Sequence, residues 1–153
     1  MSARQARSAA PLPGSRTAAG VLLDTGVLVA LYARDDARHA EATRWMARCR
    51  SELHTTAAVL TEAAYFLPMR ARPVLADLAA GGAYVVHSPD AAAHARIGAL
   101  LRKYADADPD WADMTLVWLA EATGIRRIAT LDVADFSVYR IHGRKRFELE
   151  LLR

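Results

Sequence analysis

The chain has 153 residues, of which 53% are hydrophobic and 24% are charged. This length and composition fit one well-cored globular domain and leave too few residues for two. The net charge of +3 comes from residues 1–20, which contain three of the 20 basic residues and no acid, so that 17 basic face 17 acidic residues in the remainder. The balanced remainder gives no electrostatic reason to expect a nucleic-acid binder.

The first 20 residues are expected to be a disordered extension ahead of a single domain at residues 21–153. Pro11, Pro13 and their neighbours interrupt the apolar residues of this segment, so no run has the length of a secretory signal. Asp24 splits the most apolar stretch below the roughly 18 residues of a membrane span. Cys49 is the single cysteine, which excludes an internal disulfide framework and favours a reducing compartment. We therefore expect a cytoplasmic protein without a membrane span.

The domain is predicted to open with a strand followed by a helix. Val21–Leu23 is an apolar run typical of a buried strand, and Asp24 follows it where the strand should end. From Asp36 onward, apolar residues recur at helical spacing as far as Cys49, which is expected to lie in the core. A strand followed by an amphipathic helix indicates an α/β protein.

The next segments continue the pattern. Thr55 or Thr56 can cap a helix that runs to about Phe66 and is apolar nearly all round. Residues 74–79 have another helical pattern, closed by two glycines, and residues 83–86 are predicted to form the second strand.

The second half has the clearest helix signals. At residues 88–90, serine is expected to be the N-cap and proline the first helical residue of a helix that extends to Tyr104. Asp110 can cap a further helix, which Gly124 ends, and residues 125–130 follow as a strand.

An alternating segment at Phe147–Leu151 is typical of an edge strand. The succession of short apolar strands and longer helices predicts an α/β fold with a mostly parallel sheet covered by helices. In such sheets, sites gather beyond the carboxyl ends of the strands, where Asp24 and Asp132 are both expected.

Four acids occupy positions that a strand end or a core-facing helix would normally fill with apolar residues. They are Asp24, Glu62, Asp113 and Asp132. Each alone has an ordinary explanation: Asp24 as a turn residue, Glu62 as a solvated helix position, and the other two as residues that stabilise helix N-termini. Together they could converge only if something offset their repulsion, since each like-charged pair costs about 3 kcal/mol at ~5 Å and an effective dielectric of ~20.

A bound divalent cation would offset that repulsion. Ligation by carboxylates alone, without cysteines or paired histidines, favours a hard ion such as Mg²⁺ or Mn²⁺. Such an ion activates water, neutralises phosphate oxygens and stabilises a leaving alkoxide. The four acids therefore indicate hydrolysis of a phosphodiester.

Four segments resemble the acidic blocks of the PIN-domain family in order and approximate spacing, and most closely those of VapC-type toxins of bacterial toxin–antitoxin pairs. They are Val21–Leu31, Thr55–Glu62, Tyr104–Asp113 and Ile128–Arg140. The most specific part is the T-x-D-x-x-D-F pattern at Thr130–Phe136. The resemblance implies a PIN-like three-layer α/β/α sandwich with a mostly parallel sheet and an endoribonuclease that depends on Mg²⁺ or Mn²⁺.

The resemblance also implies roles for individual residues. The catalytic, metal-binding set would be Asp24, Glu62, Asp113 and Asp132. Auxiliary positions would be Asp110, Asp135, Thr25 and Thr130, of which the two threonines would orient a carboxylate or a water. An RNA substrate, a homodimer and a cognate antitoxin that covers the acidic site are further implications.

Six basic residues are candidates for contacts with the RNA backbone, although a solvated charged surface explains each of them as well. They are Arg70, Arg72, Arg140, Arg144, Lys145 and Arg146.

Parts of the sequence are also compatible with other functions. Leu23–Gly26 resembles the catalytic loop of aspartic proteases, but their fold is all-β, whereas three segments here are strongly helical. A phosphatase with an aspartyl nucleophile requires a second acid at position 26, where this chain has glycine. A PIN-like module that binds RNA or protein without catalysis stays open, because intact ligands do not establish turnover.

Overall fold

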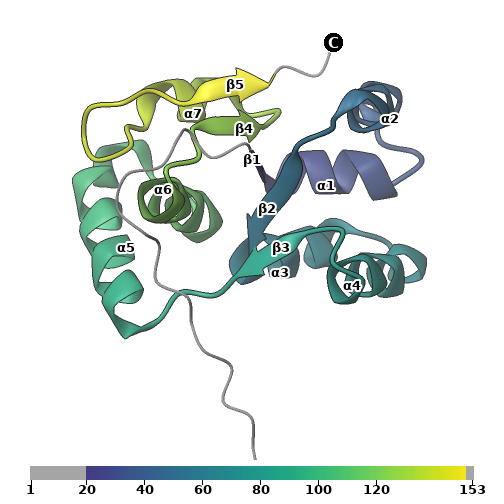
Figure 1. The fold of residues 1–153 in the computed structure, drawn as a ribbon, viewed down its shortest axis with the longest axis horizontal. Helices are drawn as coiled ribbons and strands as arrows, with labels where there is room; N and C mark the ends of the chain where they lie inside the picture. The colour runs from purple at the N-terminus through teal and green to yellow at the C-terminus, as the bar shows by residue number, and fades with distance from the viewer. Residues whose placement is uncertain (1–19, 151–153) are drawn as a thin grey trace, which may run out of the picture.

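Five parallel strands form the central sheet of the computed structural model, which describes residues 20–150 (Figure 1). The strands are β1 (Gly20–Leu23), β2 (Glu52–Thr56), β3 (Val85–His87), β4 (Arg127–Ala129) and β5 (Glu148–Glu150). Their order across the sheet is β3-β2-β1-β4-β5, and all four pairings are parallel. The prediction of a mostly parallel sheet is confirmed, with the edge strand β5 where the alternating pattern placed one.

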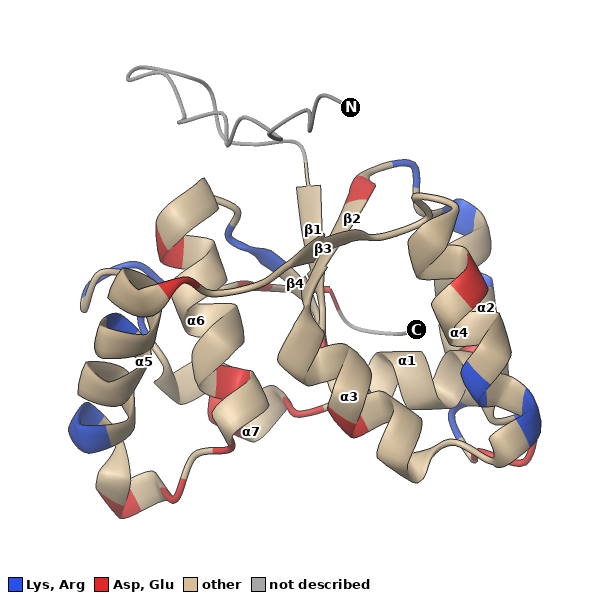
Figure 2. Cartoon of the chain, turned by 90° about the horizontal axis from the view of Figure 1, so that it is seen from below, with Lys and Arg blue, Asp and Glu red and all other residues tan. Residues whose placement is uncertain are grey.

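Helices cover both faces of this sheet. They are α1 (Thr25–Tyr32), α2 (His39–Arg48), α3 (Ala57–Phe66), α4 (Arg72–Ala80), α5 (Ala91–Lys103), α6 (Trp111–Thr123) and α7 (Val133–Val138), with short 3₁₀ turns at Met69–Ala71 and Ala105–Ala107. Figures 1 and 2 show α5 and α6 on one side of the sheet and α1, α2 and α4 on the other. The three-layer sandwich is therefore confirmed.

The central strand β1 explains why the sequence begins its domain with an uninterrupted apolar run. All four of its residues are buried, because parallel strands in such a sandwich face helices on both sides. Leu22 pairs with His54 of β2 and Ile128 of β4, so β1 lies at the middle of the sheet. The carboxyl end of β1 is thereby held between two neighbours, and Asp24 follows it directly.

Strand β2 was not predicted, and β3 begins at Val85 rather than at residue 83. β2 contains a single aliphatic residue, so its pattern does not resemble a buried strand. Thr55 and Thr56 are nevertheless fully buried. Their hydroxyls bond inside the fold, Thr55 to the Leu23 carbonyl at 3.1 Å and Thr56 to the Thr115 hydroxyl at 2.8 Å. Thr56 is also the N-cap of α3, which confirms the prediction that either Thr55 or Thr56 caps this helix.

Two helix starts differ from prediction. Asp90 is the N-cap of α5, accepting a hydrogen bond from the Ala93 amide at 2.8 Å, so the proline precedes the cap instead of occupying the first helical position. The Asp36 carboxylate accepts from the Arg38 amide at 2.7 Å in a turn, and α2 begins only at His39. A capping aspartate thus sets the start of α5, whereas α2 follows a turn held by Asp36 and its N-cap, Arg38, makes no side-chain capping hydrogen bond. Cys49 is partly buried and packs against the core.

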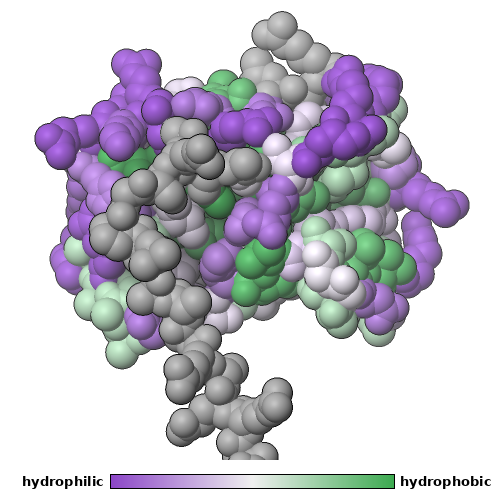
Figure 3. Space-filling model, viewed as in Figure 1, coloured by the Kyte–Doolittle hydropathy of each residue, from purple (hydrophilic) through white to green (hydrophobic). Residues whose placement is uncertain are grey.

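The expected extension at residues 1–20 lies outside the described residues except for Gly20, which begins β1, and the last three residues also lie outside them. Within residues 20–150, no helix combines the length and the apolar character needed to cross a membrane. Figure 3 shows apolar side chains near β3 and α4, where Val74 and Val86 are exposed, and hydrophilic side chains along the edge near β5 and α2.

Candidate functional site

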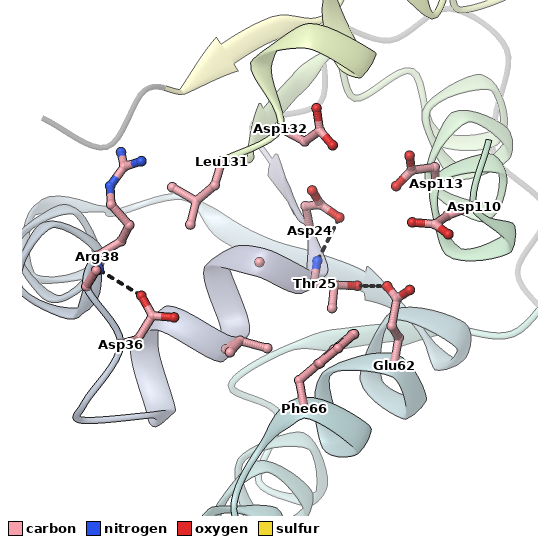
Figure 4. Close-up of a pocket in the computed structure, with 13 residues that line it drawn as sticks. Asp24, Thr25, Asp36, Arg38, Glu62, Phe66, Asp110, Asp113, Leu131 and Asp132 are labelled. Carbon is pink, nitrogen blue, oxygen red and sulfur yellow. Dashed lines mark hydrogen bonds between the residues drawn. The ribbon is translucent and has the colours of Figure 1, made fainter. Parts of the chain in front are cut away.

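An open cavity of about 990 Å³ lies at the carboxyl end of β1. Residues from α1, α3, α6 and the turn after β4 line it, and Figure 4 shows their carboxylates around a common space. The acids in the lining are Asp24, Asp36, Glu62, Asp110, Asp113 and Asp132. All four acids of the predicted metal-binding set therefore lie at one cavity, although they are far apart in the sequence.

Asp24 is fixed by the sheet and by two threonines. Its backbone amide donates to the Ala129 carbonyl at 3.1 Å, which ties the strand end to β4. One carboxylate oxygen accepts from the Thr25 amide at 2.7 Å, so Asp24 is the N-cap of α1. The other accepts from the Thr130 hydroxyl at 2.7 Å. The Thr130 hydroxyl in turn accepts from the Asp132 amide at 2.9 Å, so one threonine links two of the acids.

Burial makes Asp24 a weak acid. The residue is 6% exposed, and burial raises the pKa of its carboxyl from 3.8 to about 6. The hydrogen bonds from Thr130 and Thr25 favour the charged form and oppose this shift, while the nearby charges of Glu62 and Asp132 add to it. The cavity thus contains a carboxylate that is costly to ionise in the absence of a cation.

Asp113 is perturbed more strongly. It lies in the first turn of α6 and is 6% exposed. Burial, followed by the charge of Asp24, raises the pKa of its carboxyl to about 8. The hydroxyl of the buried Tyr139 donates to Asp113 at 3.2 Å, and burial raises the pKa of Tyr139 so that the hydroxyl keeps its proton. An acid whose sequence context suggests only a helix cap is in fact a buried group coupled to Asp24.

Glu62 and Asp132 complete the predicted set from more exposed positions. A Glu62 carboxylate oxygen accepts from the Thr25 hydroxyl at 2.5 Å, which holds α3 against the start of α1. Asp132 is exposed and is the N-cap of α7, accepting from the Asp135 amide at 3.1 Å. The capping explanation of Asp132 is thus correct, and the same side chain also lines the cavity.

The auxiliary candidates divide into two groups. Thr25 and Asp110 line the cavity, and Asp110 precedes α6 without making a capping hydrogen bond. Thr130 is buried and acts through Asp24. Asp135 does not belong to the lining, but burial and the charge of Asp132 raise the pKa of its carboxyl.

The donor set fits a divalent cation of the Mg²⁺ type. Among residues 20–150, no three His, Cys, Asp or Glu side chains are already close enough to enclose an ion. Mg²⁺ does not require such a cage, because it keeps several waters and binds through one or two carboxylates. Two buried carboxylates with raised pKa values, Asp24 and Asp113, supply that number, and a cation would relieve the cost of ionising them.

None of the six predicted RNA-contacting residues lines the cavity. Two of them bond backbone carbonyls: Arg72 bonds Leu67 at 3.1 Å, and Arg140 bonds three residues at the end of α7. The basic residue in the lining is Arg38, whose guanidinium pairs with Glu41 at 2.5 Å. No sequence pattern indicates Arg38 as a cavity residue, because the turn that places it depends on the Asp36 hydrogen bond.

Tyr139 was also not predicted as a site residue. It lies within the Ile128–Arg140 block, but a tyrosine beside an arginine is not a pattern that indicates a carboxylate partner. Phe66 and Leu131 line the cavity as apolar members and belong to segments that were predicted only as helix and strand end.

Comparisons with known proteins agree with this architecture. VapC20 of Mycobacterium tuberculosis, described as a sarcin-ricin loop cleaving toxin, has a similar solved structure with a TM-score of 0.66. The two are 22% identical, and the match covers 71% of this chain and 86% of that one. At this identity the likeness shows the fold alone. A search of curated proteins finds no match.

The PIN domain family model matches residues 21–140, which include β1, β4 and every acid that lines the cavity. The matched segment is well over half of the chain, and its fold is the one expected from the four acidic blocks. The chain therefore belongs to the PIN-domain family.

Proposed function

We propose that this protein is a divalent-metal-dependent endoribonuclease that hydrolyses RNA phosphodiester bonds. The observation that carries the proposal is the pair of buried carboxylates, Asp24 and Asp113, whose pKa values are raised to about 6 and about 8 beside one open cavity. Weak acids that share a cleft are typical of functional sites, because a folded chain gains nothing in stability from burying like charges together.

Asp24, Glu62, Asp113 and Asp132 would hold the ion, Mg²⁺ or Mn²⁺. When bound, such an ion supplies an activated water and neutralises charge on the phosphate oxygens. The chain's own hydrogen bonds orient the carboxylates that face it: Thr130 holds Asp24, Thr25 holds Glu62, and Tyr139 holds Asp113. These hydrogen bonds limit the rotation of the three carboxylates.

The test is cleavage of a panel of structured RNAs, including a sarcin-ricin stem-loop, with Mg²⁺ or Mn²⁺ and with EDTA. Asp24→Asn and Asp113→Asn are expected to reduce the cleavage rate at least 100-fold. Asp77→Asn, an exposed acid on α4, is the matched control and should leave the rate unchanged. Robust cleavage by both cavity variants would refute the proposed site. A native protein that cleaves no substrate would favour a PIN-like module that binds RNA or protein without catalysis.

We further propose that this nuclease is the toxin of a VapBC-type pair, acting in the cytoplasm. The family membership and the fold shared with VapC20 support this role. It implies a homodimer and a small antitoxin that covers the acidic cavity. The neighbouring open reading frame provides the check: a short upstream gene for a DNA-binding antitoxin is expected, and its absence would favour a housekeeping RNA nuclease.

A further inference from the structure

Three aromatic side chains are exposed beside the acidic cavity. Tyr65 and Phe66 end α3, Trp111 begins α6, and the two helices pack against each other. These side chains are 78%, 60% and 54% exposed, respectively. The rings of Tyr65 and Phe66 contact edge to face, with centroids 5.2 Å apart. Exposed apolar groups gathered next to a polar cleft are typical of a binding surface.

These aromatic residues border a second hollow of about 560 Å³, here called the aromatic hollow. Its lining consists of Ala58, Thr61, Glu62, Tyr65, Phe66, Asp110, Trp111 and Ala112. Glu62, Phe66 and Asp110 line both this hollow and the acidic cavity, so the two spaces are adjacent. Figure 4 shows the Phe66 ring beside Glu62 at that junction.

The residues that line the hollow are better suited to bind the base of a nucleotide than its phosphate. Flat aromatic faces stack on bases of any sequence. The Asp110 carboxylate, which makes no capping hydrogen bond, would repel a phosphate, whereas it can accept a hydrogen bond from an amino group on a base edge. A hollow of this composition therefore favours an uncharged ring over the sugar-phosphate chain.

We propose that the aromatic hollow binds one unpaired RNA base adjacent to the phosphodiester that the acidic cavity cleaves, with Phe66 and Trp111 as the stacking surfaces. This proposal rests on the proposed function, because it assigns the substrate's base to a space that is adjacent to that site and shares three lining residues with it. A base inside a duplex cannot be inserted between these side chains, so the site requires single-stranded RNA or a loop.

The experiment measures RNA binding rather than cleavage. A fluorescein-labelled single-stranded RNA hexamer is titrated in Mg²⁺ with protein carrying Asp24→Asn, and binding is followed by anisotropy. Adding Trp111→Leu or Phe66→Leu is expected to weaken binding about 10-fold. Trp111→Phe, which keeps a ring, should stay within about 2-fold of the parent. Val138→Ala, an exposed apolar residue on α7 outside the hollow, is the matched control and should not change binding.

An abasic hexamer separates stacking from phosphate contacts. All variants should bind it equally, and more weakly than the parent binds the normal hexamer. The proposal would be overturned if the leucine variants bound the normal hexamer as tightly as the Asp24→Asn parent does. It would also be overturned if the parent showed no measurable RNA binding. Light scattering on the same proteins tests whether a second copy of the chain occupies the hollow instead of RNA. If Trp111→Leu converts a dimer to a monomer, the hollow is a contact between copies and the proposal is overturned.

The binding and cleavage results distinguish the two proposals. Cleavage by the native protein together with RNA binding that does not depend on Trp111 would remove the base site and leave the nuclease intact. Binding that depends on Trp111, without cleavage of any substrate, would remove the nuclease and leave a base-binding module.

Discussion

Asp113 and Asp24 show how burial determines the chemistry of a carboxyl group. Both are nearly inaccessible, and burial is the largest cause of the raised pKa in each. Their hydrogen bonds from Tyr139, Thr130 and the Thr25 amide are too few to restore an ordinary acidity. The site is therefore strained electrostatically when the acids are ionised, and a cation relieves that strain.

The pH dependence of stability in EDTA follows from these shifts. Between about pH 4 and pH 8 the folded protein keeps a proton on Asp113 that the unfolded chain has lost, so the free energy of unfolding should fall as pH rises. The expected slope from this group is about 1.4 kcal/mol per pH unit. Asp24 contributes mainly below about pH 6, and His87, whose pKa burial lowers, contributes around its ordinary value with the opposite sign. Because both groups are present in the native protein and in the variant, the difference in slope between the two, measured by urea denaturation between pH 6.5 and 7.5, reports Asp113. Asp113→Asn should remove this component, and an unchanged slope in the variant would contradict the assignment.

Thr130→Val tests the positioning role of a residue that does not reach the cavity itself. The substitution keeps the shape of the side chain and removes the hydrogen bonds to Asp24 and from the Asp132 amide. We expect the affinity for Mn²⁺ to fall about 10-fold to 100-fold, as is usual when a partner of a ligating group is lost. Thr123→Val, at the end of α6, removes a hydroxyl outside the site and serves as control. Equal affinities in the two variants would show that Thr130 only stabilises the fold.

At the level of the elements, strands with continuous apolar runs were predictable and strand β2 was not. β1 is buried on both sides, so its composition alone indicates a central strand. β2 reaches the same layer with His54, Thr55 and Thr56, whose polar groups bond inside the fold. These hydrogen bonds join residues that are far apart in the sequence, so the spacing of apolar residues along the chain cannot indicate them.

The site was predictable to the extent that topology determines it. Acids that follow β1 and β4 meet because the carboxyl ends of neighbouring parallel strands lie at one edge of the sheet. Glu62 and Asp113 stood out as acids at helix positions that are normally apolar, and the family pattern added the expectation that they meet Asp24 and Asp132. Arg38 could not be predicted, because its place in the lining depends on a turn rather than on a motif.

The end of α6 provides a test of an element boundary that was predicted correctly. Gly124 has φ of 77°, a left-handed conformation that disfavours a side chain, and a Cβ there would meet no atom within 4 Å. Gly124→Ala should therefore lower the free energy of unfolding by about 1 kcal/mol through backbone strain alone. Gly98→Ala, inside α5 and with room for a methyl group, should raise it by about 0.5–1 kcal/mol. Urea denaturation measures both, and the same sign for the two variants would contradict this explanation.

On the scale of the whole molecule, the cavity is lined by acids, whereas an RNA-binding surface is expected to be positively charged. The chain carries a net charge of +3, but three of its arginines lie in residues 1–20, and six acids line the cavity. Attraction to RNA must therefore come from bound cations and from local contacts, such as the proposed base site. RNA affinity should consequently depend on the divalent ion.

The proposed homodimer is tested by multi-angle light scattering of the native chain. The chain has a mass of 16.7 kDa, and the dimer should show twice that value at micromolar concentration. A mass equal to one chain across the concentration range would contradict the homodimer without affecting the nuclease proposal.

Calorimetric titration with Mn²⁺ at pH 8 tests the central claim most directly, because Asp24 is then ionised and Asp113 is close to its pKa of about 8. The native protein is predicted to bind the ion, Asp113→Asn to bind it at least 10-fold more weakly, and Asp77→Asn to bind it as the native protein does. A native protein that binds no Mn²⁺, or an Asp113→Asn variant that binds it equally well, would contradict the assignment of this cavity as a metal-dependent active site.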